Sequence, residues 1–300
     1  MSDLTTAQYA RGALYGMAAV SIWSGWIVVA RLGLRTSLTP SDIAAVRFGV
    51  AGLLLLPYLL RRGLALGRLG LPGLAAIVFG GGAPVLLTNA GLSFAPAAEA
   101  GALFPGVMPL MVAILAAFVL QEPFTATKRA GFALILIGVV AIVSGAGATF
   151  STRQNIGQLL FLGSALAWAF YTVAMRRARL DGLHAAAIAA VGALVLYLPV
   201  YVLVAGARIF NAPLGDVALQ AIVQGLLTAI VSLLLYGRAV SILGASSGAA
   251  FAALCPALTA LMAIPVLGEW PTASDWIAVI LISSGVYVVS GGPMPGQRKL

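Results

Sequence analysis

The hydrophobic positions of this chain gather into long runs in which apolar and polar residues do not alternate. Leu74–Leu92 and Val107–Leu120 are examples. A strand that crosses a membrane needs about 9–11 alternating residues, whereas a helix needs about 20 that are mostly apolar. Only helices satisfy their own backbone hydrogen bonds over such runs in hydrocarbon. The pattern therefore predicts membrane-spanning helices rather than a barrel.

Short polar breaks divide the chain into about ten such helices. Ser41 or Asp42 can cap the second helix, and Asp216 can help to start the eighth. We expect an all-α membrane protein with helices at 11–31, 42–60, 72–93, 97–120, 128–146, 156–176, 184–205, 216–240, 246–267 and 273–291. No segment between them is long enough for an extramembrane domain.

Composition supports a lipid-facing surface and excludes several kinds of site. Hydrophobic residues make up 61% of the chain and charged residues 8%, with a mean hydropathy of +1.06, whereas soluble proteins carry about 25% charged residues. A single histidine, His184, and a single cysteine, Cys255, exclude a multi-histidine metal site and a disulfide framework. No catalytic constellation or nucleotide-binding motif is present, so we expect no cofactor, no metal, no enzyme activity and no ATP-driven pumping by this chain.

The basic residues predict the orientation of the chain in the membrane. The N-terminal residues carry Asp3 rather than a basic run, so the first hydrophobic stretch is expected to remain as a membrane helix. With the N-terminus inside, twelve of the 17 lysines and arginines face the cytoplasm. The remainder are Arg31, Arg35, Arg47, Arg153 and Arg208. We therefore expect an inner (plasma) membrane protein with both termini in the cytoplasm, whose net charge of +9 reflects topology rather than nucleic-acid binding.

The two halves of the chain, 1–150 and 151–300, resemble each other. A shift of about 147 positions brings Gly101, Phe104, Pro109 and Glu122 onto Gly248, Phe251, Pro256 and Glu269, and Trp23 and Arg31 align with Trp168 and Arg176. Each half holds about five helices, an odd number, so the second copy must enter the membrane from the opposite side. Inverted repeats of this kind are typical of secondary transporters, with the site near the midplane where the repeats meet. Two equivalent halves also allow inward-open and outward-open states of similar energy.

Several short motifs resemble those of a known family. The second helix reads A-x-x-R-F over Ala44–Phe48, and the fourth helix of each half ends in L-x-E, at Leu120–Glu122 and Leu267–Glu269. Over nearly the whole chain this pattern resembles the drug/metabolite transporter superfamily, EamA type. The resemblance implies export of amino acids and related metabolites, with the YddG-type amino-acid exporters as the nearest group. The second half departs from the pattern because Ala189 stands where Arg47 would be repeated, so a role of that arginine is not duplicated.

Polar and aromatic side chains inside apolar spans are candidates for a substrate site. They are Asn89, Thr88, Trp168, Tyr171, Phe104, Ser232, Tyr236 and Glu99. Asn89 offers both a donor and an acceptor to a polar substrate group, or else makes an interhelical hydrogen bond. The central aromatic residues line a cavity or pack between helices. Ser232 and Tyr236 lie on one side of the eighth helix and are placed to oppose Asn89 across the pseudo-two-fold.

Charged and small residues allow further alternatives. Glu99 pairs with a substrate ammonium, carries a proton, or is a solvated carboxylate at a helix N-terminus. Glu122 and Glu269 are expected to be caps or gate elements at opposite membrane faces, and Arg47 to pair with Asp42 or a phosphate head group. Four glycines are expected at close helix contacts. They are Gly131, Gly138, Gly244 and Gly248.

The sequence favours a secondary transporter that exports small metabolites, most of all amino acids, by alternating access. The expected partners are this small-molecule substrate and the lipid bilayer, with the chain acting as a monomer. A multidrug/proton antiporter is an alternative that would depend on Glu99, and a nucleotide-sugar carrier is another, for which Arg47 alone supplies a basic group. A membrane-embedded lipid-modifying enzyme is disfavoured because such enzymes usually carry intramembrane His/Asp pairs.

Overall fold

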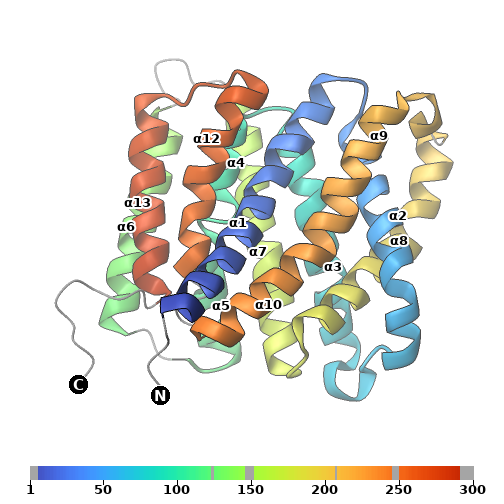
Figure 1. The fold of residues 1–300 in the computed structure, drawn as a ribbon, viewed down its shortest axis with the longest axis horizontal. Helices are drawn as coiled ribbons and strands as arrows, with labels where there is room; N and C mark the ends of the chain where they lie inside the picture. The colour runs from blue at the N-terminus through green and yellow to red at the C-terminus, as the bar shows by residue number, and fades with distance from the viewer. Residues whose placement is uncertain (1–5, 123–124, 146–151, 207, 245–249, 291–300) are drawn as a thin grey trace.

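The helices of this protein lie side by side in a single bundle (Figure 1). The computed structural model describes residues 6–122, 125–145, 152–206, 208–244 and 250–290, and over these ranges it contains helices and no strand. Helix α1 begins and α13 ends at the same end of the bundle, which we call the N-terminal end. The turn between α12 and α13 lies at the opposite end, called the Glu269 end below.

The first half supplies six helices, of which two are parts of one broken helix. They are α1 (Thr6–Arg35), α2 (Pro40–Arg62), α3 (Leu66–Gly91), α4 (Ala97–Leu103), α5 (Met108–Val119) and α6 (Ala126–Gly145). The run expected to be one helix over 97–120 is interrupted at residues 104–107. This interruption contains Pro105 and Gly106, and proline removes a backbone donor from the helical ladder.

The second half repeats this order with its own irregular segments. It contains α7 (Thr152–Arg177), α8 (Gly182–Ala205), the 3-10 helix η1 (Arg208–Asn211), α9 (Leu214–Gln220), the π-helix η2 (Ala221–Val231), α10 (Ser232–Leu243), the 3-10 helix η3 (Phe251–Leu254), α12 (Cys255–Leu267) and α13 (Ala273–Val289). The 3-10 turn at 251–254 occupies the position that repeats the break at 104–107. Both halves therefore interrupt their fourth helix at the equivalent place.

Eight helical stretches are long and apolar enough to cross a membrane, from Thr6–Arg35 to Leu214–Leu243. Two shorter apolar helical stretches, Phe251–Leu267 and Ala273–Val289, follow them in the part of the chain that the structure describes. This agrees with a multi-pass membrane protein.

Local hydrogen bonds explain where several helices begin. Thr39 is the N-cap of α2, and its side chain and that of Asp42 each accept a hydrogen bond from the other's backbone N–H. The cap is therefore Thr39 and neither Ser41 nor Asp42, and Asp42 contributes from the third helical position of this capping box. Asp216 lies in the first turn of α9, after Pro213, and its carboxylate accepts a hydrogen bond from Ser37 at 2.9 Å.

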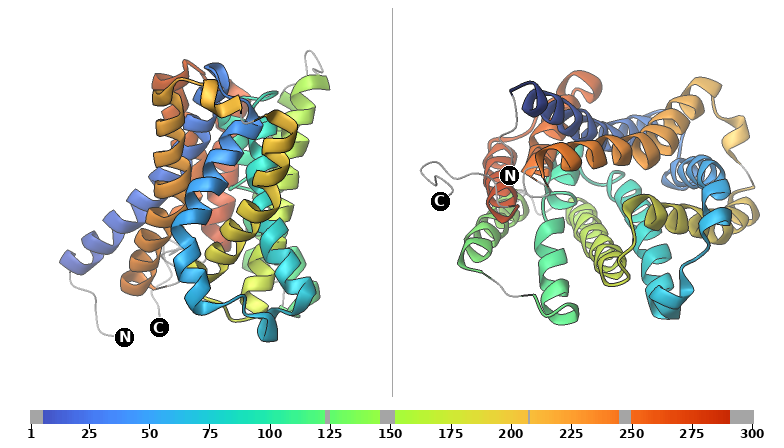
Figure 2. Two further views of the ribbon diagram at one scale, coloured as in Figure 1. Left: turned by 90° about the vertical axis from the view of Figure 1, so that its right-hand side faces the viewer. Right: turned by 60° about the horizontal axis from the view of Figure 1, so that its bottom comes forward.

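The two halves interleave rather than stand apart. The first helix of each half packs against the third helix of the other, so α1 lies along α10 and α7 along α3. Helices α2 and α8 pack against each other, as do α6 and α13, and these are pairs of equivalent helices. Figure 2 shows α1 beside α10 and α6 beside α13. The core is therefore shared between the halves.

Glycines permit the closest of these contacts. A Cβ built on Gly131 would lie 2.6 Å from a side-chain carbon of Val289, and one on Gly138 would lie 2.6 Å from Ile282, so both glycines serve close packing of α6 on α13 as predicted. The prediction for Gly244 is wrong. This glycine ends α10 with a φ of +87°, and no described residue beyond its chain neighbours places an atom within 4 Å of a built Cβ. Gly248 lies outside the described residues.

Candidate functional site

The Glu269 end of the bundle is held by an ion-pair network centred on Glu269. One carboxylate oxygen of Glu269 accepts hydrogen bonds from Arg31 at 2.8 Å and Arg35 at 2.5 Å. The other oxygen accepts the backbone N–H of Ala97 at 2.8 Å, at the start of α4. Arg31 also donates to the carbonyl oxygen of Leu92. One carboxylate thus joins α1, the start of α4 and the turn before α13.

A matching ion pair lies at the N-terminal end. Arg176, in the last turn of α7, donates to the carboxylate of Glu122, which follows α5. Arg176 repeats Arg31 and Glu122 repeats Glu269, so each pair joins the first helix of one half to the end of the fourth helix of the other. The side chains of Arg176 and Glu122 are 41% and 33% exposed, against 19% and 12% for Arg31 and Glu269. The ion pair at the Glu269 end is therefore the more buried of the two.

Asn89, near the end of α3, is a buried amide that has no hydrogen-bond partner among the residues the structure describes. Its side chain is 0% exposed, and neither its nitrogen nor its oxygen is bonded. The adjacent Thr88 differs, because its hydroxyl donates to Ser164 of α7 at 2.9 Å. Of the two alternatives for these neighbours, an interhelical hydrogen bond therefore describes Thr88 and does not describe Asn89.

Two of the aromatic contacts involve tryptophans that the repeat relates, Trp23 and Trp168. Trp23 of α1 donates from its indole to Ser232 of α10 at 2.9 Å, and its ring lies 5.1 Å from that of Tyr236. Ser232 and Tyr236 thus contact Trp23, and none of their hydrogen bonds reaches Asn89. In the other half, the rings of Trp168 and Tyr171 are 4.9 Å apart.

Tyr171 is buried where α7 packs closely on α3. A Cβ built on Gly80 would lie 2.7 Å from the backbone nitrogen of Tyr171, so a larger residue at position 80 would displace it. Trp168 is only partly buried and packs against two separate hydrophobic clusters. This position between clusters distinguishes Trp168 from a residue held inside a single core.

Phe104 lies in the break between α4 and α5. Its ring meets that of Trp26 edge-on, with 6.3 Å between the ring centroids. Trp26 was absent from the sequence-based candidates. The sequence of an apolar helix does not show whether its tryptophan lines a cavity or packs between helices. The contact connects the broken helix to α1.

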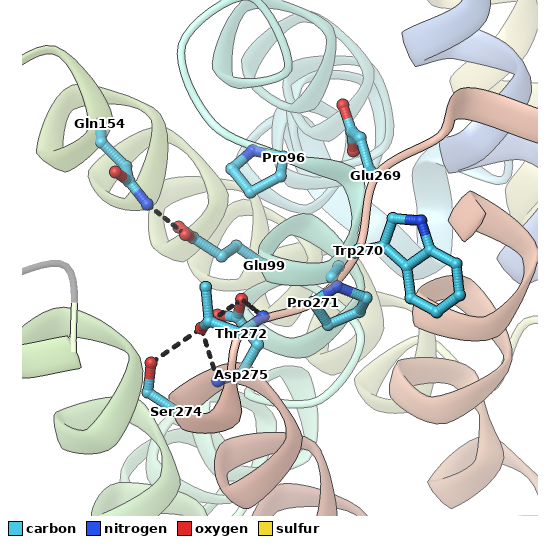
Figure 3. A pocket seen from close by; sticks show the side chains of 10 residues that line it. Pro96, Glu99, Gln154, Glu269, Trp270, Pro271, Thr272, Ser274 and Asp275 are labelled. Carbon is cyan, nitrogen blue, oxygen red and sulfur yellow. Dashed lines mark hydrogen bonds between the residues drawn. The ribbon is translucent and has the colours of Figure 1, made fainter.

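Glu99 lines a pocket of about 260 Å³ at the Glu269 end, where Figure 3 shows it turned toward Gln154. Gln154 donates to one carboxylate oxygen of Glu99, and Gln158 donates to the other at 2.8 Å. Glu99 is 3% exposed, so the interpretation of a solvated helix-terminal carboxylate is wrong. The pocket also receives Glu269 and Asp275, and none of Glu99's hydrogen bonds involves the central aromatic residues.

Arg47 of α2 binds a different partner from the expected one. Its guanidinium donates to the side-chain oxygen of Gln224 at 3.1 Å and lies 4.9 Å from the centre of the Trp26 ring. Asp42 instead accepts hydrogen bonds from Thr39 and from the Tyr201 hydroxyl, the latter at 2.6 Å. The prediction of an Arg47–Asp42 pair is therefore wrong, because helix capping already occupies the carboxylate.

Comparison with known proteins identifies the family. A profile of the EamA-like transporter family matches residues 10–144 and matches again over residues 155–291. The chain belongs to the EamA-like transporter family. As a member of this family it is a membrane transporter rather than an enzyme, and the double match agrees with the two-repeat architecture.

Curated relatives of this EamA-like transporter are also named as transporters. The uncharacterized inner membrane transporter YedA of Escherichia coli K12 is 28% identical over 297 residues, which cover 94% of this chain and 93% of YedA. The uncharacterized transporter YyaM of Bacillus subtilis strain 168 is 28% identical over 84% of this chain and 85% of YyaM. A solved crystal structure of a protein shares the fold, with a TM-score of 0.59 and 21% identity over 93% of this chain and 96% of that chain.

Proposed function

We propose that this EamA-like transporter exports small metabolites, above all amino acids, across the inner membrane by alternating access. The observation that carries the proposal is the reciprocal ion pairing at the two ends of the bundle. Arg31–Glu269 and Arg176–Glu122 are repeat-related, and each would close one mouth of a shared path. Exchange of conformation between the halves would strengthen one pair as it weakens the other.

The proposed topology has ten spans in two inverted halves, 1–150 and 151–300. The eight long helical stretches and the two shorter ones supply these spans, with α4 joined to α5 and α9 to α10. The basic residues favour a cytoplasmic N-terminal end, which makes the Glu269 end the outer one. Because one chain holds both halves, we propose that the monomer is the transporting unit.

The substrate site is proposed within the bundle, with Asn89 of α3 as a polar ligand and the breaks in the two fourth helices as further parts of the site. A buried donor or acceptor left unpaired costs about 1–3 kcal/mol. Asn89 carries both kinds of unpaired group, so a bound substrate that pairs with it would recover that free energy. Helix breaks at equivalent positions in both halves are typical of transporter binding sites.

Transport by the purified protein in liposomes tests this function. Vesicles loaded with an unlabelled L-amino acid should accumulate the same labelled amino acid by exchange faster than protein-free vesicles do. A panel of L-amino acids that all fail to exceed the protein-free rate would contradict amino-acid transport. The same assay with a pH gradient of either sign tests whether protons drive the cycle.

Asn89→Ala is expected to lower the exchange rate about tenfold, because a lost hydrogen bond to substrate worth about 1.4 kcal/mol is a tenfold change in affinity. Trp168→Ala should act in the same direction by removing a wall of the site. Asn211→Ala is the matched control, since Asn211 is exposed in η1. Unchanged exchange in both site variants would show that the site lies elsewhere.

Proton-coupled drug export is the second candidate, and the burial of Glu99 favours it. A carboxylate that is 3% exposed within a transporter can carry a proton between the two states. Under this hypothesis Glu99→Gln abolishes the dependence of transport on a pH gradient while binding is retained. If the variant keeps the wild-type pH dependence of transport, Glu99 serves only to hold Gln154 and Gln158.

A further inference from the structure

Arg47 is an arginine in a long apolar helix, and no acidic residue in the described part of the chain pairs with it. None of the ion pairs among the described residues includes it. Its guanidinium makes one hydrogen bond, to the neutral amide of Gln224, and one contact with the face of Trp26. Charged groups within membranes are rare and usually pair with one another or mark a transport path. The positive charge of Arg47 has no such compensation.

The surroundings hold Gln224 so that its oxygen faces Arg47. The side-chain nitrogen of Gln224 donates to the carbonyl oxygen of Trp26 at 3.3 Å and to the side-chain oxygen of Gln220 at 3.2 Å. Gln220 in turn donates to the carbonyl oxygen of Val29 at 2.7 Å. Both glutamines are buried, at 0% and 1% exposure. This chain of bonds fixes one N–H of the guanidinium and leaves the remaining donors for another acceptor, because arginine has five.

The partner of Arg47 lies in the one π-helix of the described residues. Gln224 is in η2, whose eleven residues, Ala221–Val231, widen the helix opposite α2. π-helical segments occur frequently at functional sites. In the first half the equivalent segment lies within α3 and is an ordinary α-helix.

The repeat shows that the fold does not require an arginine here. Ala189 of α8 stands at the position equivalent to Arg47, and it faces α3 at close range. A Cβ built on Gly81 would lie 2.5 Å from the Cβ of Ala189. One half therefore fills this contact with small residues, while the other places a charge and an amide in it. This difference between the halves indicates that Arg47 has a role in function and is not needed to hold the fold.

Arg47 is also connected to the broken helix. The Trp26 ring that contacts its guanidinium meets Phe104 edge-on, within the break between α4 and α5. Arg47 as a whole residue is partly buried, so protein does not cover all of its surface. The charge is thus placed beside the region proposed above as the substrate site.

We propose that Arg47 binds the carboxylate of the transported metabolite, with Trp26 and Gln224 positioning the guanidinium. A planar guanidinium matches the two oxygens of a carboxylate in a bidentate pair. One uncompensated positive charge balances one carboxylate, whereas a phosphate would call for more. This inference rests on the proposed function and specifies the chemical class of its substrate.

Ligand-induced stabilisation of the purified protein in detergent tests the inference. The probes are L-amino acids, the corresponding L-amino-acid amides, which lack the carboxylate, and inorganic phosphate. The wild type should be stabilised against thermal unfolding by at least one acid and not by its amide. Arg47→Gln should weaken the apparent affinity for that acid at least tenfold, and Arg61→Gln, on the exposed end of the same helix, should leave it unchanged.

A second variant covers the case in which Arg47→Gln does not fold. Gln224→Glu places a carboxylate against Arg47 within the protein, so it should keep the fold and still abolish stabilisation by acids. The inference would be overturned if acids and amides stabilised the wild type alike, if phosphate stabilised it and acids did not, or if no probe did. It would also be overturned if acids stabilised both variants as strongly as the wild type. Binding of acids through Arg47 without any labelled transport would contradict the proposed function and leave the carboxylate site supported.

Discussion

Glu269→Gln is expected to slow amino-acid exchange at least tenfold and to open the outer end of the bundle. The substitution removes the charge that binds two arginines and weakens the bond to the start of α4. Hydrogen bonds to charged groups contribute about 1.5–3 kcal/mol each. The state with a closed outer end therefore loses much of the free energy that stabilises it. A protein that cannot hold its outer end closed spends little time open to the inside, so each transport cycle is slower.

Thiol labelling measures the opening directly. Ala95 is 1% exposed beside this network, so Ala95→Cys in a Cys255→Ser background should resist a membrane-impermeant maleimide. It should react once Glu269→Gln is added. The double exchange Arg31→Glu with Glu269→Arg should recover part of the transport rate, because the paired charges are restored. If the Cys at position 95 stays unlabelled in the Glu269→Gln protein and exchange is as fast as in the wild type, the network is not a gate.

Glu122→Gln is the matched comparison at the other end. The Arg176–Glu122 pair is more exposed, and Leu180 stands where the repeat of Arg35 would lie. Water screens an exposed pair, so its loss has a smaller effect on the equilibrium between states. A larger defect in Glu122→Gln than in Glu269→Gln would contradict the expectation that the more buried ion pair contributes more to closing the bundle.

Gly285→Leu is expected to destabilise the protein by about 1–3 kcal/mol or more, since overpacking at a tight contact forces the backbone apart. A Cβ at position 285 would lie 2.5 Å from the carbonyl oxygen of Gly131, and backbone cannot rotate away as a side chain does. This contact joins α6 to α13, equivalent helices of the two halves. Thermal unfolding in detergent measures the effect.

Gly237→Leu serves as the control, because a Cβ at position 237 has no atom within 4 Å. It makes the same chemical change within a helix of the second half. Equal loss of stability in the two variants would mean that leucine harms these helices generally, and that the α6–α13 contact is not specially tight.

Hydropathy was sufficient to predict the helices, and matched residues indicated the repeat, but the fourth helix was expected to be continuous and is interrupted at residues 104–107. An apolar run long enough to cross the membrane must form a helix, whichever helix lies beside it. The same argument could not reveal the π-helix around Gln224, since its residues are as apolar as those of an ordinary helix. Nor could it separate Asn89 from Thr88, two adjacent polar residues of which one found a partner and the other did not.

Errors of prediction fell on residues whose partners lie far away in the chain. Arg47 was expected to pair with Asp42 on its own helix, and it instead binds Gln224, which is 177 positions away. Glu99 was open to a solvated role, and two glutamines of α7 enclose it. Sequence spacing describes neighbours along one helix, whereas these partners are chosen by the crossing of helices from both halves.

The sequence by itself therefore determined that this is a helical membrane protein built from two related halves, because the length and polarity of a segment decide whether it can lie in lipid. It also marked Glu122 and Glu269 as a related pair. Only the tertiary structure decided that Glu269 binds Arg31 and Arg35. It also decided that, among the described residues, Asn89 has no hydrogen-bond partner and Arg47 no acidic one. Pairing depends on which side chains the interleaved halves bring within a few ångströms, and that information belongs to the packing of the helices.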